Sequence, residues 1–362
     1  MTLAALLDSL PIPILQAPMV GATLDEMTVA VSEAGGMGTL AAGALAPADI
    51  GPAIDAIRTR TSASFGVNLL MAPKADPAPG EVDAALARLA PWYADLGAPL
   101  PETPNQFAPD FDAQFDAVVA AAPPVASFTF AILTPTQVKR LQAAGTYVVG
   151  TATTVAEARA WAEVGADGVC AQGFEAGGHR GHFLGDIEQS LVGTLALVAT
   201  IRAAVDLPVI AAGGIMDGRG VAAGLALGAA AVQMGTAFLL ADETVTSRPW
   251  RRAAAAATDD PTRLTRAFTG RYARGIENRF MRLMHGVQDD VPAYPVQNRL
   301  TQPLRAAAAK ADDPEYLSLW AGQAVRLART GRAADMIRAW WAEAAEVADA
   351  LTARTRRGQE TE

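Results

Sequence analysis

Hydrophobic residues gather in eight short runs, separated by segments of helical composition. The runs are Ile12–Pro18, Gly36–Ala42, Ser64–Leu70, Val125–Phe130, Tyr147–Ala152, Asp167–Gly173, Pro208–Ile215 and Ala230–Leu240. Most are continuously apolar, which is typical of parallel strands covered on both faces. The segments between them, such as Pro135–Ala144 and Gly218–Leu227, have the length of crossover helices. Eight βα units in order predict an α/β fold, a closed TIM (β/α)8 barrel.

Two segments depart from this alternation. The chain between the third and fourth runs is rich in proline and too irregular for one crossover helix, so we expect an insertion at about residues 72–124 that forms a flap or a partner-facing excursion. After Leu240 an arginine-rich, aromatic segment leads into alanine-rich helical stretches. The sequence therefore predicts a barrel over residues 1–240 and a mainly helical C-terminal appendage over residues 241–362.

Composition and charge limit the kinds of molecule that the protein is expected to bind. The formal net charge of −9 argues against a nucleic-acid-binding surface, because phosphate neutralisation needs clustered Lys and Arg. The opening residues lack the basic segment of a secretory signal, and the single Cys170 favours a reducing compartment. The uncharged stretch 221–241 contains three glycines and is interpreted as a buried helix, turn and strand. We expect a cytoplasmic enzyme with no membrane partner, and the sequence leaves a monomer and a homodimer both open.

The strand ends carry the candidate chemistry, because the active site of an α/β barrel lies at the C-terminal ends of its strands. Gly213, Gly214 and Gly235 follow the last two strands, where backbone N–H groups can approach a phosphate closely. The helix beginning near Asp217 is expected to direct its positive end to the same place. Neither a Rossmann nor a P-loop glycine motif is present, so the phosphate is expected to belong to a bound cofactor.

Two amide side chains lie at other strand ends. Asn68 and Gln172 each offer a donor and an acceptor, which suits the edge of a heterocycle such as a flavin ring. Satisfying the backbone of a neighbouring loop is an equally good role for either amide.

The most distinctive segment is the glycine-rich loop that follows Gln172 and contains His179 and His182. Imidazole titrates near neutral pH, so His179 is a candidate general base, or alternatively a hydrogen-bond partner of a neighbouring loop. No second pair of ligands accompanies His182, and we expect no metal. Cys170 lies deeper in the same strand and is expected to be an apolar filler.

Several motifs closely resemble those of the nitronate monooxygenases, formerly called 2-nitropropane dioxygenases. They are QAPM at 16–19, GVNL at 66–69, EAGGHRG at 175–181, PVIAAGGI at 208–215 and QMGTAF at 233–238. The later runs AFTGR at 267–271 and LWAGQ at 319–323 look like the class I branch of that family. The resemblance covers nearly the whole chain, and the histidine loop is its most specific element.

This resemblance implies a TIM barrel that holds non-covalent FMN and oxidises an anionic alkyl nitronate, or a nitroalkane, with O2 to a carbonyl compound and nitrite. It implies that His179 is the catalytic histidine. The residues that it places against FMN are Met19, Asn68, Gln172, Gly177, Gly214, Gln233, Met234, Gly235, Thr236 and Tyr294. One departure is Tyr272, which stands where the family pattern has proline, so the shape of that loop is not carried over.

Two other functions compete with this interpretation. A flavin barrel with a loop histidine also resembles the FMN-dependent enoyl-acyl-carrier-protein reductases and the NAD(P)H:quinone reductases, which must accommodate a pyridine nucleotide over the flavin. A barrel that binds FMN only as a non-catalytic scaffold is the third alternative. Reduction of the flavin by a nitronate, by NADPH or by neither separates the three.

Overall fold

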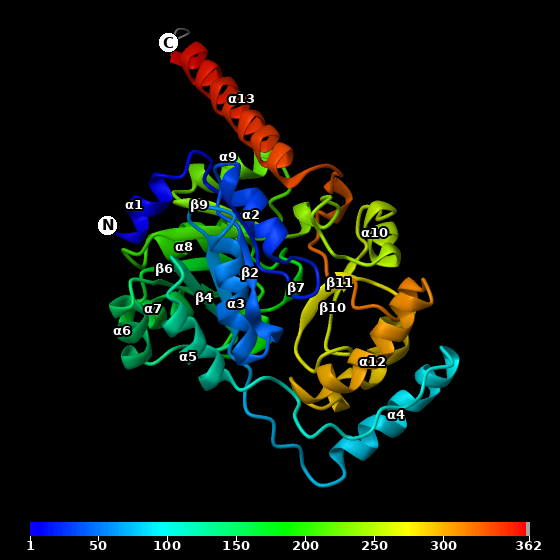
Figure 1. Ribbon diagram of the computed structural model, residues 1–362. Coiled ribbons are helices and arrows are strands. Elements are labelled where there is room, and N and C mark those ends of the chain that lie inside the picture. Colours follow the sequence, from blue (N-terminus) through cyan, green and yellow to red (C-terminus); the bar gives the residue numbers. More distant parts are fainter. Residues whose placement is uncertain (360–362) are drawn as a thin grey trace.

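Eight parallel strands form a closed barrel within residues 1–359, the part of the chain that this computed structural model describes (Figure 1). Their order is β1-β9-β8-β6-β5-β4-β3-β2, and a parallel bridge from Leu15 to Met37 joins β1 to the segment before β2. The strands are β1 (Ile14–Gln16), β2 (Thr39–Ala41), β3 (Gly66–Leu70), β4 (Val125–Thr129), β5 (Tyr147–Ala152), β6 (Gly168–Gln172), β8 (Val209–Ala212) and β9 (Ala231–Met234). Each lies inside its predicted run, and the predicted barrel is confirmed.

Helices surround this sheet. They are α2 (Asp25–Glu33), α3 (Pro47–Arg58), α5 (Phe111–Ala121), α6 (Pro135–Ala143), α7 (Val155–Glu163), α8 (Thr194–Arg202) and α9 (Gly218–Ala226). Short 3-10 turns are η1 (Ala42–Ala44), η2 (Ile187–Ser190), η3 (Thr236–Phe238), η4 (His285–Asp290), η5 (Pro314–Tyr316) and η6 (Val325–Leu327).

Strand side chains alternate between two apolar layers, because successive residues point to opposite faces. Outward residues such as Val67 and Val232 pack under the surrounding helices. Inward residues such as Val149 and Ile210 fill the lower barrel, where Leu7 of α1 (Leu3–Asp8) packs against them. The barrel is therefore plugged at the N-terminal ends of its strands, and its polar residues lie at the other end.

The proline-rich segment contains a helix that the sequence analysis did not predict. In α4 (Glu81–Asp95), Val82, Leu86, Leu89 and Tyr93 recur at helical spacing and are buried. They pack on α12 (Val296–Lys310), and in Figure 1 α4 (cyan) extends beside α12 (orange). The expected partner-facing excursion is in fact bound to the C-terminal part of the same chain.

The C-terminal region is mainly helical, as predicted, and it also contributes a small sheet. The helices are α10 (Arg248–Ala255), α11 (Arg279–Met284), α12 and α13 (Ala333–Gln359). Strands β10 (Thr262–Thr265) and β11 (Ala273–Ile276) are antiparallel, and β11 also pairs with β7 (Gly178–His179) from the histidine loop. We call this C-terminal region, within residues 241–359, the cap, and the C-terminal ends of the barrel strands the barrel mouth. The cap is therefore hydrogen-bonded directly to the histidine loop at the barrel mouth.

The last helix, α13, packs on α9 and α2 through its first turns and then extends away from the barrel (Figure 1). No helix within residues 1–359 combines the length and the apolar content needed to cross a membrane.

Candidate active site

Polar side chains line the barrel interior just above its apolar lower layer. Asn68 donates to the Ser127 hydroxyl at 3.0 Å, and the hydroxyls of Thr129 and Thr151 lie 3.0 Å apart. Gln233 on β9 shares the inward parity and donates weakly to the Cys170 sulfur at 3.5 Å. The predicted Asn68 and Gln233 are therefore brought to the mouth, whereas Cys170 is buried and its pKa is raised to about 12 by desolvation.

The amide of Gln172 holds the histidine loop. Its Nε2 donates to the carbonyl of His179 at 3.0 Å, and its Oε1 accepts from the N–H of Gly181 at 2.8 Å. Across the loop, His179 pairs with Ala273 of β11. Gln172 therefore satisfies loop backbone, the second of the two roles considered for it, and the loop is fixed from both the barrel and the cap.

Three aromatic rings enclose the imidazole of His179. Ring centroids lie 5.5 Å away for Phe130, 5.8 Å for Tyr294 and 5.6 Å for Trp320. The fourth neighbour is Thr269, whose hydroxyl is 2.9 Å from Nε2. We call these three rings the aromatic box. Of its members the sequence analysis proposed only Tyr294 as a site residue, because Phe130, which directly follows β4, and Trp320 meet His179 only when the C-terminal region folds onto the barrel.

The aromatic box changes the expected chemistry of His179. Burial, followed by the positive charges of Arg271 and Arg305, lowers its pKa to about 3. The imidazole is therefore neutral at physiological pH and does not titrate near neutrality, contrary to the expectation from an unperturbed histidine. A base with so low a pKa is poorly matched to abstracting a proton from a weak carbon acid at pH 7.

Two buried charged residues that the sequence analysis missed fix the loop. Arg180 is fully buried and donates to the carbonyls of Gly173 and Ser190, each at 2.7 Å. The carboxylate of Glu157, also fully buried, accepts from the backbone N–H groups of Phe183 and, at 3.0 Å, Leu184. No local sequence signal marks Glu157, since it lies in the crossover helix α7.

The glycine-bearing strand ends present free backbone donors. Within residues 1–359, the N–H groups of Gly214, Gly235 and Thr236 have no acceptor. Gly214 has a φ of +70°, in the region that favours glycine. Met19 lies beside Gly235, since a Cβ built there would be 3.6 Å from the Met19 sulfur. These groups form a cradle in which an anion such as phosphate would find donors.

The cap closes over this cradle. The N–H of Gly322 donates to the Thr236 hydroxyl at 2.8 Å. A Cβ on Gly177 would lie 2.5 Å from the backbone of Ala321, so only glycine permits this approach. Gly177 and Thr236 therefore lie together, although they are far apart in the sequence.

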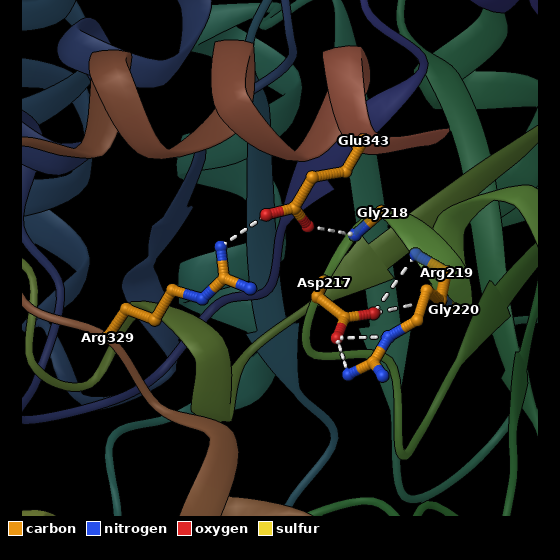
Figure 2. Close-up of polar contacts among 6 residues, drawn as sticks. All are labelled: Asp217, Gly218, Arg219, Gly220, Arg329 and Glu343. Carbon is orange, nitrogen blue, oxygen red and sulfur yellow. Dashed lines mark hydrogen bonds and ion pairs between the residues drawn. The ribbon is translucent and has the colours of Figure 1, made fainter. Parts of the chain in front are cut away.

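The first turn of α9, in contrast, is not available to a ligand. Asp217 Oδ1 accepts from the N–H of Arg219 at 3.0 Å, and Glu343 Oε2 accepts from the N–H of Gly218 at 3.0 Å. Figure 2 shows both carboxylates at this turn. The expectation that this helix end faces a phosphate is wrong, because carboxylates of the chain already satisfy its donors.

One predicted residue does not direct its side chain to the site. Met234 is buried in the layer between the strands and the helices, and its carbonyl accepts from the N–H of Ala17 at 2.9 Å. Tyr272, the departure from the family pattern, keeps its loop tied to the site, since its carbonyl accepts from the N–H of Arg180 at 2.8 Å.

Comparisons with known proteins agree along the whole chain. The family model described as nitronate monooxygenase matches residues 4–343. A probable nitronate monooxygenase of Staphylococcus aureus (strain Newman) is 42% identical over 323 residues, which are 89% of this chain and 91% of the relative. Among solved structures, nitroalkane oxidase from Streptomyces ansochromogenes is similar with a TM-score of 0.89 at 43% identity, covering 96% of this chain and 99% of that one. FabK from Thermotoga maritima is similar with a TM-score of 0.75 at 29% identity, covering 97% and 98%.

Proposed function

Because the chain belongs to the nitronate monooxygenase family, we propose that it is an FMN-dependent enzyme that oxidises alkyl nitronates with O2. In the balanced overall reaction, two nitronate anions and one O2 give two carbonyl compounds and two nitrite ions: each nitronate carbon gains one oxygen atom as its carbon–nitrogen bond breaks. The observation that carries this proposal is the enclosure of His179 by the aromatic box, next to the cradle of free backbone donors.

The cradle fits the phosphate of FMN. Its donors come from the exposed Gly214, the half-buried Gly235 and the buried Thr236, and their N–H groups are free to bind an anion. Asn68, Gln233 and Met19 lie around the same mouth and are the side chains that would face the flavin ring. When bound, the flavin would supply the redox chemistry by accepting electrons from the substrate and passing them to O2.

The residues of the chain would select and orient the substrate. The rings of the aromatic box would line the approach of a small planar group to the half-buried His179. Thr269 fixes the orientation of the imidazole through Nε2. Because His179 is neutral, it would orient the substrate by hydrogen bonding rather than by charge. A nitronate has already lost its α-proton, whereas a neutral nitroalkane needs a base. The site therefore favours the preformed nitronate over the parent nitroalkane.

Two measurements test the proposal. Denaturing the purified protein and separating the supernatant by chromatography should release FMN, and recovery of FAD or of flavin attached to the chain would contradict the cofactor assignment. The holoenzyme should then release nitrite from a primary alkyl nitronate with O2 uptake. An NADPH-dependent reduction of a quinone or enoyl thioester without nitronate turnover would instead favour the reductase alternative.

A further inference from the structure

A pocket of about 290 Å3 lies beside the histidine loop, separate from the aromatic box. The loop contributes His182 and Asp186, and the cap contributes Arg266, Arg271 and Tyr272. Apart from the electrostatic effect of Arg271 on His179, none of these side chains has a role in the chemistry proposed above. The pocket therefore needs its own explanation.

Arg271 brings an unpaired positive charge to this pocket. Its Nε donates to the carbonyl of Arg180 at 3.0 Å, and its Nη2 donates to the carbonyl of His182. Within residues 1–359, no carboxylate lies within 4.0 Å of its guanidinium, and Nη1 has no acceptor. Burial lowers the pKa of Arg271 to about 10, so the group remains charged at neutral pH. Arg271 is half-buried, and its free Nη1 can donate a hydrogen bond to an anionic ligand in the pocket.

Arg266 adds a second, only partly balanced cation. Its Nη1 lies 3.8 Å from Oδ1 of Asp289, whose side chain is 78% exposed, so that pair is weak. The pocket wall also includes the exposed carboxylate of Asp186. The nearby carboxylate of Glu157 is occupied by the backbone of the loop. Two cations, partly offset by Asp186 and Glu157, therefore line or border this pocket in a protein whose net charge is −9.

The wall of the pocket also holds an unsatisfied polar atom. Nδ1 of His182 is buried and has no hydrogen-bond partner within the described residues. Burial lowers the pKa of His182 to about 4, so this ring is neutral and can donate one hydrogen bond to an anion. This unsatisfied nitrogen lies within the pocket wall rather than on its surface, so an anion would reach it only where the wall opens; it is an observation independent of the two arginines.

Arg271 links the pocket to the aromatic box. Its guanidinium carbon lies 4.3 Å from the centre of the Phe130 ring, and Phe130 lies 5.5 Å from His179. One side chain therefore borders both the outer pocket and the ring that covers the candidate catalytic histidine.

We propose that this pocket is an outer binding site for a small planar oxyanion, occupied by the nitronate substrate before it reaches His179 and by nitrite as it leaves. The nature of the substrate rests on the proposed function, whereas the oxyanion site stands on Arg266, Arg271 and His182 alone. The two arginines would concentrate the anion locally against the repulsion of an acidic protein.

The site can be tested without turnover, because the chain has only three histidines. Nitrite titrated into 15N-histidine-labelled holoenzyme should shift the His182 ring signals saturably, while chloride at equal ionic strength should not. Arg266→Gln should weaken the apparent affinity for nitrite by about 3- to 10-fold, as expected for loss of one partly exposed charge. Arg299→Gln, which removes an exposed arginine of α12 outside the pocket, should bind as the parent does. Equal responses to nitrite and chloride, or equal affinity in Arg266→Gln, would overturn the assignment.

Steady-state kinetics separate this inference from the proposed function. With a nitronate as substrate at low salt, Arg266→Gln should lower kcat/KM by the same roughly 3- to 10-fold while kcat stays as in the parent. The difference in kcat/KM between variant and parent should shrink as the salt concentration is raised. A protein that shows the His182 response but oxidises no nitronate would contradict the proposed function and retain the oxyanion site. Nitronate oxidation without a His182 response would contradict the oxyanion site and retain the proposed function.

Discussion

At the scale of single residues, the neutral imidazole of His179 gives a direct prediction for the pH dependence of turnover. Its pKa is lowered to about 3, so the ring carries no charge change between pH 5 and pH 9. We expect kcat/KM for a preformed nitronate to show no histidine ionisation in that range. A pH profile of kcat/KM that shows an apparent pKa of 6 to 7 in the parent, and no such pKa in His179→Asn, would contradict this account.

Gly235 gives a prediction about the cofactor. A Cβ there would lie 3.3 Å from Ala17 and 3.6 Å from Met19, so the fold has little obstacle to a small side chain. The branched side chain of Gly235→Val should block the N–H donors of the cradle and give a folded protein without flavin absorbance. Gly286→Val is the matched control, since nothing lies within 4 Å of a Cβ at Gly286. Full flavin content in Gly235→Val would place the phosphate elsewhere.

The sequence predicted part of this site, for a physical reason. Strand ends can be read from apolar runs, so Asn68, Gln172 and Gly235 were found from the pattern. Phe130 and Trp320 were not, because they approach His179 only through the folding of the cap onto the barrel. The lowered pKa of His179 follows from that enclosure and was equally invisible.

At the scale of elements, the contact between α9 and α13 depends on Gly218. A Cβ at Gly218 would lie 2.3 Å from Cβ of Glu343 and 2.4 Å from the carbonyl of Trp340 (compare Figure 2). Gly218→Ala should therefore lower the free energy of unfolding by about 1–3 kcal/mol, although alanine favours helices.

The control for this contact is Gly51→Ala in α3, where nothing lies within 4 Å of the added Cβ. It should raise the free energy of unfolding by up to about 1 kcal/mol through helix propensity alone. Urea unfolding of both variants provides the comparison. A neutral or stabilising effect of Gly218→Ala would show that α13 is not packed on α9 in this way.

The sequence predicted the barrel strands better than it predicted β10, β11 and α4. Buried parallel strands are continuously apolar, so all eight barrel strands were recognised. The strands β10 and β11 carry arginines and have no continuous apolar run, so they give no comparable signal. Prolines around α4 hid its helical spacing, which becomes informative only once α12 provides a surface for it.

At the scale of the whole molecule, two partly or fully enclosed neutral histidines make the fold sensitive to acid. His179 and His182 have folded pKa values of about 3 and 4, below the unfolded value of 6.5. The unfolded state therefore binds more protons than the folded state below pH 6.5. The contribution of these two histidines to the free energy of unfolding is fully present above that pH and is lost as the pH is lowered toward 4.

A histidine variant tests this linkage. His182→Asn should reduce the loss of unfolding free energy between pH 7 and pH 5 by about 1 kcal/mol relative to the parent protein. The measurement is the urea midpoint at both pH values. An identical pH dependence in the parent and in His182→Asn would contradict the low pKa of His182.

The central claim is that an alkyl nitronate, and not NADPH, reduces the bound flavin. The most direct test is anaerobic rapid mixing of the holoenzyme with a primary alkyl nitronate, and separately with NADPH, while the visible absorbance of the flavin is followed. The account predicts bleaching by the nitronate on the timescale of turnover, no bleaching by NADPH, and nitrite release when O2 is readmitted. Bleaching by NADPH and none by the nitronate would contradict it.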